Sequence, residues 1–128
     1  MKVLLDTHVL LWYLDGDPLP SKIIAILEDK ETKRMVSIAS LWELTIKISL
    51  NKLQTSRSLT DIHQHLLSQI GFEILDIKFA HLQALLTLPH FHNDPFDRLI
   101  IAQSLTENVP IISVDRHFSS YPATIIWQ

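Results

Sequence analysis

The chain begins with MKVLLDT, residues 1–7, and the rest of the predicted fold is arranged around this segment. Its centre, Val3–Leu5, is a continuous apolar run without alternating polar positions. Such a run is typical of a strand buried on both faces of a parallel sheet. The run stops at Asp6, and Thr7 opens the following helix. Asp6 is therefore predicted at the carboxyl end of a central strand, which is the edge of open α/β sheets where ligands bind.

The composition is that of a folded protein. With 128 residues, of which 47% are hydrophobic and 20% charged, the chain has the size of one ordinary domain, and we expect a single domain over residues 1–128. No apolar stretch approaches the ~18 residues that cross a membrane, and residues 1–6 lack the apolar core of a signal peptide. We therefore expect a cytoplasmic protein without a membrane partner. The absence of cysteine excludes disulfides, thiolate metal sites and cysteine nucleophiles.

The charge balance gives no direct sign of a nucleic-acid partner. The formal net charge is −3, the isoelectric point is about 6.1, and no block of Lys and Arg stands out. These values count against a protein that binds nucleic acid through a basic surface alone. Cations bound at four acids (Asp6, Glu43, Asp97 and Asp115) would change the formal charge from −3 to +1. Charge alone therefore leaves the partner open.

Apolar periodicity and turn residues predict strands that alternate with helices. Strands are expected at residues 3–5, 35–38, 72–75, 109–113 and 124–127, the third of them toward a sheet edge. Helices are expected at residues 8–15, 20–27, 41–50, 60–70, 78–88 and 95–107. The pattern predicts a three-layer α/β/α fold with a mainly parallel central sheet.

Four acids are predicted at the same edge of the sheet. Asp6 and Asp115 each follow a strand, while Glu43 and Asp97 are each predicted in the first turn of a helix. Strand ends and helix starts meet at one edge of such a sheet. Clustered carboxylates raise one another's pKa unless cations occupy the cluster, and an oxygen-only ligand set favours Mg²⁺ or Mn²⁺ over zinc. Two such ions ~3.5–4 Å apart can activate water and stabilise the leaving oxygen in phosphodiester cleavage.

Each acid also has a simpler explanation when taken alone. Asp6 fits a helix cap as well as a metal ligand, and Glu43 and Asp97 could complement helix dipoles. Asp115, before Arg116, could belong to an ordinary turn or surface pair. Only the shared placement of these acids favours a metal site.

Four further residues could support the site. Asp94 precedes Pro95 and is interpreted as a helix N-cap, although it could also face the acids. Arg98 could bind a scissile phosphate or pair with an acid such as Asp94, and the structural role is favoured. Thr7 and Ser113 could donate hydrogen bonds to site carboxylates or metal-bound water, or only cap local backbone.

Histidines and tryptophans give weaker signals. The pairs at residues 63 and 65 and at residues 90 and 92 have a spacing that shares a face only in extended chain, which does not favour zinc binding. Trp12, Trp42 and Trp127 are interpreted as core or interface residues rather than base-stacking platforms.

The motifs LLDTH (4–8), SLWE (40–43), HNDPFDRLIIAQ (92–103) and ISVD (112–115) together resemble a PIN domain. More narrowly, the chain is similar to the VapC-type toxins of bacterial toxin–antitoxin pairs. The resemblance covers essentially the whole chain, and the stretch at residues 92–98 is specific to one branch of these proteins.

This resemblance implies an Mg²⁺- or Mn²⁺-dependent endoribonuclease that cuts RNA, forms a homodimer, and is held inactive by a cognate antitoxin that also binds operator DNA. Asp6 and Asp97 would be the principal metal ligands. Glu43 would complete the site, Asp115 would act through water, and Thr7 occupies the small hydroxyl position after the first aspartate. No acid of the motif is missing, so an active member is expected.

Two other functions stay open at the level of sequence. One is a phosphatase with Asp6 as covalent nucleophile, but that chemistry generally uses a second aspartate two positions on, where His8 stands. The other is a non-catalytic binding module in which the acids serve as caps and ion pairs. A glycine-rich nucleotide loop is not supported, because Gly16 and Gly71 are the only glycines and neither follows a buried strand. Substrate choice is predicted to lie in surface loops such as residues 54–60.

Overall fold

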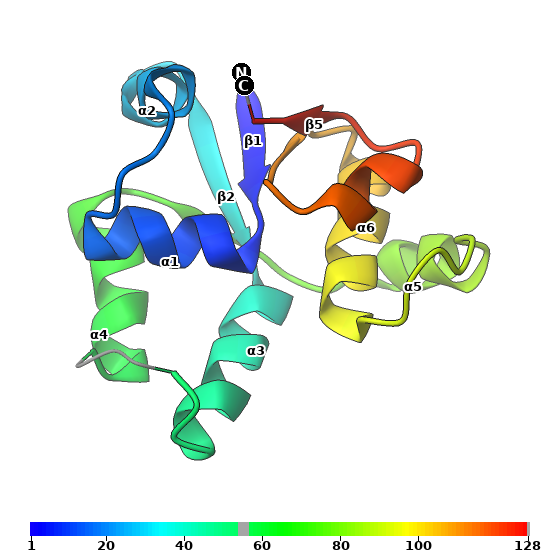
Figure 1. Cartoon of the computed structure of the whole chain (residues 1–128), viewed down its shortest axis with the longest axis horizontal. Helices are drawn as coiled ribbons and strands as arrows, with labels where there is room; N and C mark the ends of the chain where they lie inside the picture. Colours follow the sequence, from blue (N-terminus) through cyan, green and yellow to red (C-terminus); the bar gives the residue numbers. More distant parts are fainter. Residues whose placement is uncertain (54–56, 128) are drawn as a thin grey trace.

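The computed structural model describes residues 1–53 and 57–127, which form a five-stranded sheet covered by helices on both faces (Figure 1). The strand order is β3-β2-β1-β4-β5, and every neighbouring pair is parallel. The strands are β1 (Lys2–Leu5), β2 (Lys33–Ser37), β3 (Glu73–Leu75), β4 (Ile111–Ile112) and β5 (Ile125–Ile126). The predicted α/β class and the edge position of the third strand are confirmed.

Helices connect the strands from β1 to β4, which supplies the crossovers that parallel pairing needs. They are α1 (Thr7–Asp15), α2 (Ser21–Glu28), α3 (Ile38–Ser49), α4 (Leu59–Gln64), α5 (Phe79–Leu86) and α6 (Pro95–Glu107). A π-helical turn, His65–Gln69, continues α4, and a 3₁₀ turn, Arg116–Ser120, follows β4. None of the helices in the described ranges is long and apolar enough to cross a membrane.

The start of α3 differs from the prediction. The sequence predicted a strand through residue 38 and a helix from residue 41, but the helix begins at Ile38. The Ser37 hydroxyl accepts a hydrogen bond from the Ala39 amide at 3.0 Å, so Ser37 caps the helix directly at the end of β2. The predicted first-turn position of Glu43 is therefore wrong, because Glu43 falls in the second turn.

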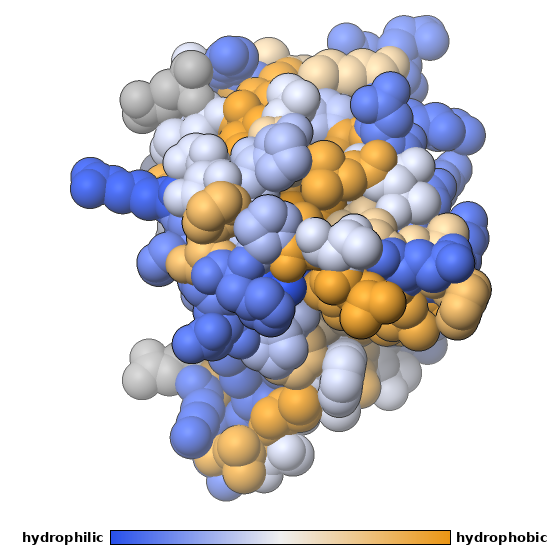
Figure 2. All heavy atoms as spheres, turned by 90° about the vertical axis from the view of Figure 1, so that its right-hand side faces the viewer, coloured by the Kyte–Doolittle hydropathy of each residue, from blue (hydrophilic) through white to orange (hydrophobic). Residues whose placement is uncertain are grey.

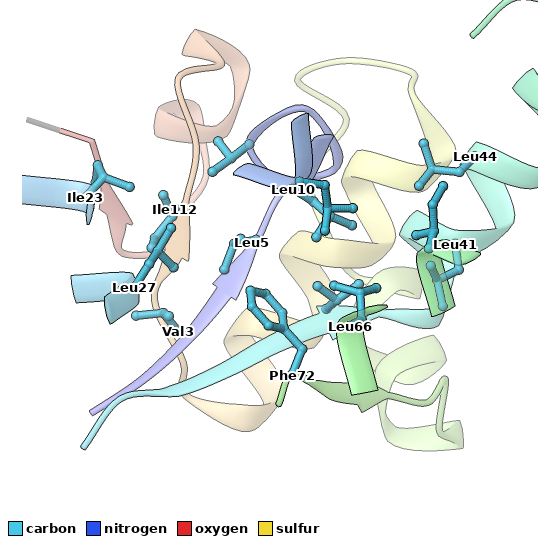
Figure 3. Close-up of a cluster of buried hydrophobic side chains, with 14 residues drawn as sticks. Val3, Leu5, Leu10, Ile23, Leu27, Leu41, Leu44, Leu66, Phe72 and Ile112 are labelled. Carbon is cyan, nitrogen blue, oxygen red and sulfur yellow. The ribbon is translucent and has the colours of Figure 1, made fainter. Parts of the chain in front are cut away.

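The central strand is buried on both faces, as predicted. Val3 and Leu5 pack into a core shared with α1, α2, α3 and α4 (Figure 3), while Leu4 faces a second core against α6. Successive side chains of a strand point to opposite faces, so an uninterrupted apolar run is what a middle layer needs. These two cores establish the three-layer α/β/α arrangement.

Two further predictions concern the surface. Trp12 and Trp127 are partly buried and pack on each other with ring centroids 6.1 Å apart, whereas Trp42 is 54% exposed. The predicted selectivity loop at residues 54–60 includes residues 54–56, which lie outside the described residues. Its role in substrate choice stays a prediction.

The sheet places two helix starts at one edge. In Figure 1, β1 and β2 run toward the same end of the molecule, where α1 and α3 begin. Asp6 lies between β1 and α1, and Ser37 lies between β2 and α3. The carboxyl edge of the sheet is thus the place where the predicted acids have to meet.

Candidate metal centre

Asp6 lies at the end of β1 and is only 2% exposed. Its Oδ1 accepts a hydrogen bond from the Val9 amide at 2.9 Å, so it caps α1, and the Ser113 hydroxyl donates to Oδ2. Burial raises the pKa of Asp6, opposed by the hydrogen bonds from Ser113 and Val9. Asp6 is therefore a helix cap and a buried carboxylate of the sheet edge at the same time.

Glu43 is buried on α3, where it cannot complement the helix start because it lies in the second turn. Its Oε2 is 3.3 Å from Lys47 Nζ, one helical turn further on. Its Oε1 is buried and has no hydrogen-bond partner among the residues that the structure describes. A buried carboxylate oxygen without a donor is costly, and a bound cation would relieve that cost.

Asp97 lies in the first turn of α6, as predicted. Burial is the main cause that raises its pKa to about 8. Repulsion from further carboxylates adds to this rise, in decreasing order from Asp94, Glu43, Asp115 and Asp6. The other three acids of the predicted cluster thus lie close enough to Asp97 to act on its charge.

Asp115 lies at the rim of this group, with 29% of its side chain exposed. It caps the 3₁₀ turn, because its Oδ1 accepts a hydrogen bond from the His117 amide at 2.9 Å, and the His117 ring nitrogen Nδ1 lies 3.0 Å from the same oxygen. Its own amide donates to the Ser113 hydroxyl at 3.0 Å. Ser113 therefore links the two strand-end acids, Asp6 and Asp115.

The supporting residues have distinct roles. Asp94 is the predicted N-cap of α6, because its Oδ1 accepts from the amides of Phe96 and Asp97 at 2.9 and 3.1 Å. Its charge also acts on Asp97, so it belongs to the same acidic neighbourhood. Thr7 donates to the Ser40 hydroxyl at 2.9 Å rather than to a carboxylate, and this bond ties the start of α1 to α3.

Arg98 is buried against loop backbone. Its guanidinium donates to the carbonyl oxygens of Leu88 at 3.2 Å and Pro89 at 2.7 Å and to the Tyr121 hydroxyl at 3.2 Å. These contacts hold the segment that precedes α6 and so position Asp94 and Asp97. Arg98 thus makes the contacts of a structural residue, and its role toward phosphate stays a prediction.

Two histidines that the sequence did not mark as site residues border the acids. His92 Nε2 lies 3.6 Å from Asp97 Oδ2, and the His92 ring stacks on the His117 ring with centroids 5.1 Å apart and planes 5° apart. Burial lowers the pKa of His92, with a further contribution from His117. His92 belongs to the motif at residues 92–98, and its place in this motif is the sequence feature that could have marked it as a site residue. His117 carried no signal beyond its closeness to Asp115.

The arrangement fits a divalent cation held by oxygen ligands. Within residues 1–53 and 57–127, no three Asp, Glu or His side chains already surround one point closely enough to hold a metal ion. Carboxylates that repel one another stay apart until a cation neutralises them. The unpartnered Glu43 Oε1 and the raised pKa of Asp97 are the properties that a hard cation would relieve.

Comparison with known proteins gives a family and a fold. A profile of the PIN domain matches residues 3–123, and no curated protein matches the sequence. A chain of VapBC2 from Rickettsia felis, solved with a promoter DNA fragment, superposes with a TM-score of 0.76 at 18% identity over 100% of both chains. DNA-bound VapBC from Salmonella typhimurium gives 0.71 at 16% identity over 98% of this chain and 97% of that one. FitAcB from Neisseria gonorrhoeae gives 0.65 at 20% identity, over 97% and 96%.

Proposed function

The chain belongs to the PIN domain family, and we propose that it is a divalent-cation-dependent endoribonuclease. Its biological role would be that of the toxin in a bacterial toxin–antitoxin pair of the VapC type. The main support for the proposal is the position of Asp97, a largely buried carboxyl group surrounded by other carboxylates. Its pKa is raised by burial and by four further carboxylates. Such a group of acids is suited to bind Mg²⁺ or Mn²⁺.

Three acids would bind the cation directly, and a fourth would act through water. Asp6, Glu43 and Asp97 are the proposed direct ligands, because each is largely withdrawn from solvent at the sheet edge. Asp115 lies at the rim, where its side chain is more exposed. When bound, the cation would activate a water and stabilise the leaving oxygen of a phosphodiester.

Neighbouring residues of the chain would fix the orientation of these acids, and one of them would add a positive charge beside the site. Ser113 and the start of α1 fix both oxygens of Asp6. Lys47 keeps Glu43 Oε2 in place and adds a partly exposed positive charge beside the site. One bound divalent cation would change the formal charge of the chain from −3 to −1, and two would change it to +1, which reduces the repulsion of an RNA backbone.

We further propose a protein antitoxin as partner. The structurally similar proteins from Rickettsia felis and Salmonella typhimurium were solved as VapBC complexes with DNA. Here an apolar groove of about 480 Å³ lies between α3 and α4 and includes the exposed Trp42. Trp42 contacts Phe96 edge to face at 4.9 Å, and these aromatics neighbour Glu43 and Asp97 in sequence. A segment seated in this groove would lie beside the acids.

A homodimer is proposed from the outer face of α5. Phe79, Leu82 and Leu86 follow helical spacing and are exposed, Leu86 to 84%. Figure 2 views the molecule from this side, where apolar side chains gather at the surface. A second copy of the chain would remove them from water.

The other two functions are less well supported. The cap explanation accounts for Asp6, Asp94 and Asp115, and Asp97 in the first turn of α6 could complement the helix dipole. It leaves the buried Glu43 Oε1 without a partner among the described residues, which weighs against a binding module. For a phosphatase, the position two residues after Asp6 holds an exposed His8 in place of the second aspartate.

RNA cleavage by purified protein tests the proposal. Wild type should cut RNA with Mg²⁺ or Mn²⁺, EDTA should abolish cutting, and Asp6→Asn should be inactive. Asp17→Asn, an exposed change purified in parallel, should keep full activity and so exclude a contaminating nuclease. Cleavage by Asp6→Asn at the wild-type rate would overturn the proposal. A trapped phosphoaspartate at residue 6 would favour the phosphatase, and the absence of cation binding would favour the binding module.

A further inference from the structure

A buried ring nitrogen beside the acids has no hydrogen-bond partner. His92 Nε2 is unpaired among the described residues and lies 3.6 Å from Asp97 Oδ2, which is too long for a hydrogen bond. Only 11% of the His92 side chain is exposed. The ring is held by stacking on His117 and by the edge of Tyr121, with centroids 5.1 and 5.5 Å away. Its position is therefore fixed by packing against the 3₁₀ turn at residues 116–120 and the residue that ends it, Tyr121.

The contacts on the other side of the ring decide where its proton lies. Arg98 Nη1 donates to the Tyr121 hydroxyl at 3.2 Å, and that hydroxyl lies 2.8 Å from His92 Nδ1. A guanidinium can only donate, so the tyrosine oxygen accepts from it. Tyr121 is buried, and its own hydrogen needs an acceptor, which His92 Nδ1 supplies. A neutral ring that accepts at Nδ1 carries its hydrogen on Nε2.

We propose that His92 is a positioning residue for Asp97, because its Nε2 lies 3.6 Å from Oδ2 and a hydrogen bond there would leave Oδ1 for the cation. The proposal rests on the cation site described under Proposed function. A small shift of either side chain would shorten the 3.6 Å separation to a hydrogen bond, and we expect this bond to form when a cation orders the carboxylate. Donors behind a ligating group set its orientation and contribute to metal affinity.

A purely structural histidine does not explain this arrangement. The contact with Tyr121 would be satisfied by any acceptor at the Nδ1 position. Nε2, in contrast, is buried without a partner, and an unsatisfied buried donor lowers stability unless it serves something else. Contacts thus run from the buried Arg98 through Tyr121 and His92 to one carboxylate oxygen of Asp97.

Two substitutions at residue 92 distinguish the role of Nε2 from the role of Nδ1. The amide of His92→Gln places an N–H close to the position of Nε2, whereas His92→Asn reproduces only the Nδ1 side. We expect the Mn²⁺ affinity of the full chain, measured by titration calorimetry without RNA, to fall about tenfold or more in His92→Asn. His92→Gln should stay close to the wild type. The matched control is His90→Asn, an exposed change two residues earlier, which should bind as the wild type does.

Nitrogen chemical shifts of the His92 ring give a second, independent readout. With Mg²⁺ present, we expect the proton on Nε2 and a bare Nδ1, and Tyr121→Phe should abolish this preference. The spectrum needs no variant at residue 92, so it decides the case even where His92→Asn fails to fold. A proton on Nδ1 in the Mg²⁺-loaded wild type would overturn the proposal.

The outcomes distinguish this proposal from the function on which it rests. Equal Mn²⁺ affinity in wild type, His92→Gln and His92→Asn would overturn the positioning role and leave the nuclease proposal intact. A wild type that binds no Mn²⁺ would overturn both. Weaker binding in His92→Asn, rescue in His92→Gln and an Nε2 proton together are the expected result.

Discussion

Ser113 stands 107 positions after Asp6 in the sequence, and its hydroxyl donates a hydrogen bond to the Asp6 carboxylate. The contact exists because β1 and β4 are adjacent parallel strands, with Leu5 opposite Ile112, so both strands end at the same edge. The fold thereby supplies the first acid of the site together with a donor that holds it.

Ser113→Ala should lower the free energy of unfolding by about 1–3 kcal/mol, because a buried carboxylate oxygen loses its donor. Urea unfolding measures this change. The matched control is Ser119→Ala, which removes only an exposed hydroxyl and should change stability by less than about 0.5 kcal/mol. Equal stability of the two variants would contradict the role given to Ser113.

Asp97→Asn should change how the stability of the cation-free protein depends on pH. The folded protein keeps a proton on Asp97 up to a pH of about 8, while the unfolded chain releases it near the ordinary value of 3.8. The folded state then binds more protons, so wild-type stability should fall as pH rises between these values. Asp97→Asn lacks this contribution and should show a smaller fall when unfolded by urea in EDTA. Asp17→Asn should follow the wild type, and a wild-type slope in Asp97→Asn would count against the raised pKa.

Cation binding should release protons. Because a ligating carboxylate has to be ionised, Mn²⁺ displaces the proton from Asp97, whose pKa is raised to about 8. The affinity should therefore rise as the pH approaches 8 and level off above it. Calorimetry in buffers of different ionisation enthalpy measures the release directly. Binding that is independent of pH over this range would contradict the prediction.

Arg98→Lys should destabilise the protein by about 2–4 kcal/mol, because one ammonium cannot reach the three acceptors that the guanidinium contacts. Thermal and urea unfolding measure the loss. A variant with wild-type stability but weaker RNA binding would instead assign Arg98 to the phosphate.

Leu86→Glu should convert a dimer into a monomer, because it places a charge on the exposed apolar face of α5. Light scattering coupled to size-exclusion chromatography reports the mass. Leu67→Glu, at an exposed apolar residue in the turn after α4, is the matched control and should leave the mass unchanged. A wild type that is monomeric at every concentration would contradict the proposed dimer.

Local signals predicted the parts of the fold that depend on few residues. The uninterrupted apolar run at Val3–Leu5 marked the central strand, and Asp94 before Pro95 marked the start of α6. The start of α3 was misplaced because Ile38 extends an apolar run that favours a strand. Pairing with β3 reaches Ser37, which then caps the helix, and this depends on the register of the sheet rather than on local sequence.

The candidate acids were identified from predicted strand ends and helix starts, and their clustering predicted raised pKa values, but not which acid is raised or which oxygen lacks a partner. The unpartnered Glu43 Oε1 and the raised pKa of Asp97 depend on which side chains meet in space. The link from His92 to Tyr121 spans 29 positions and has no local pattern that could predict it. Composition and spacing identify the residue types, and only the packing gives their partners.

Anomalous diffraction from crystals soaked in Mn²⁺ would test the proposed cation site, because it locates the ion without any assumption about activity. We expect a manganese peak bounded by the carboxylates of Asp6, Glu43 and Asp97. Manganese bound elsewhere on the protein, with no peak between these three side chains, would contradict the proposed site.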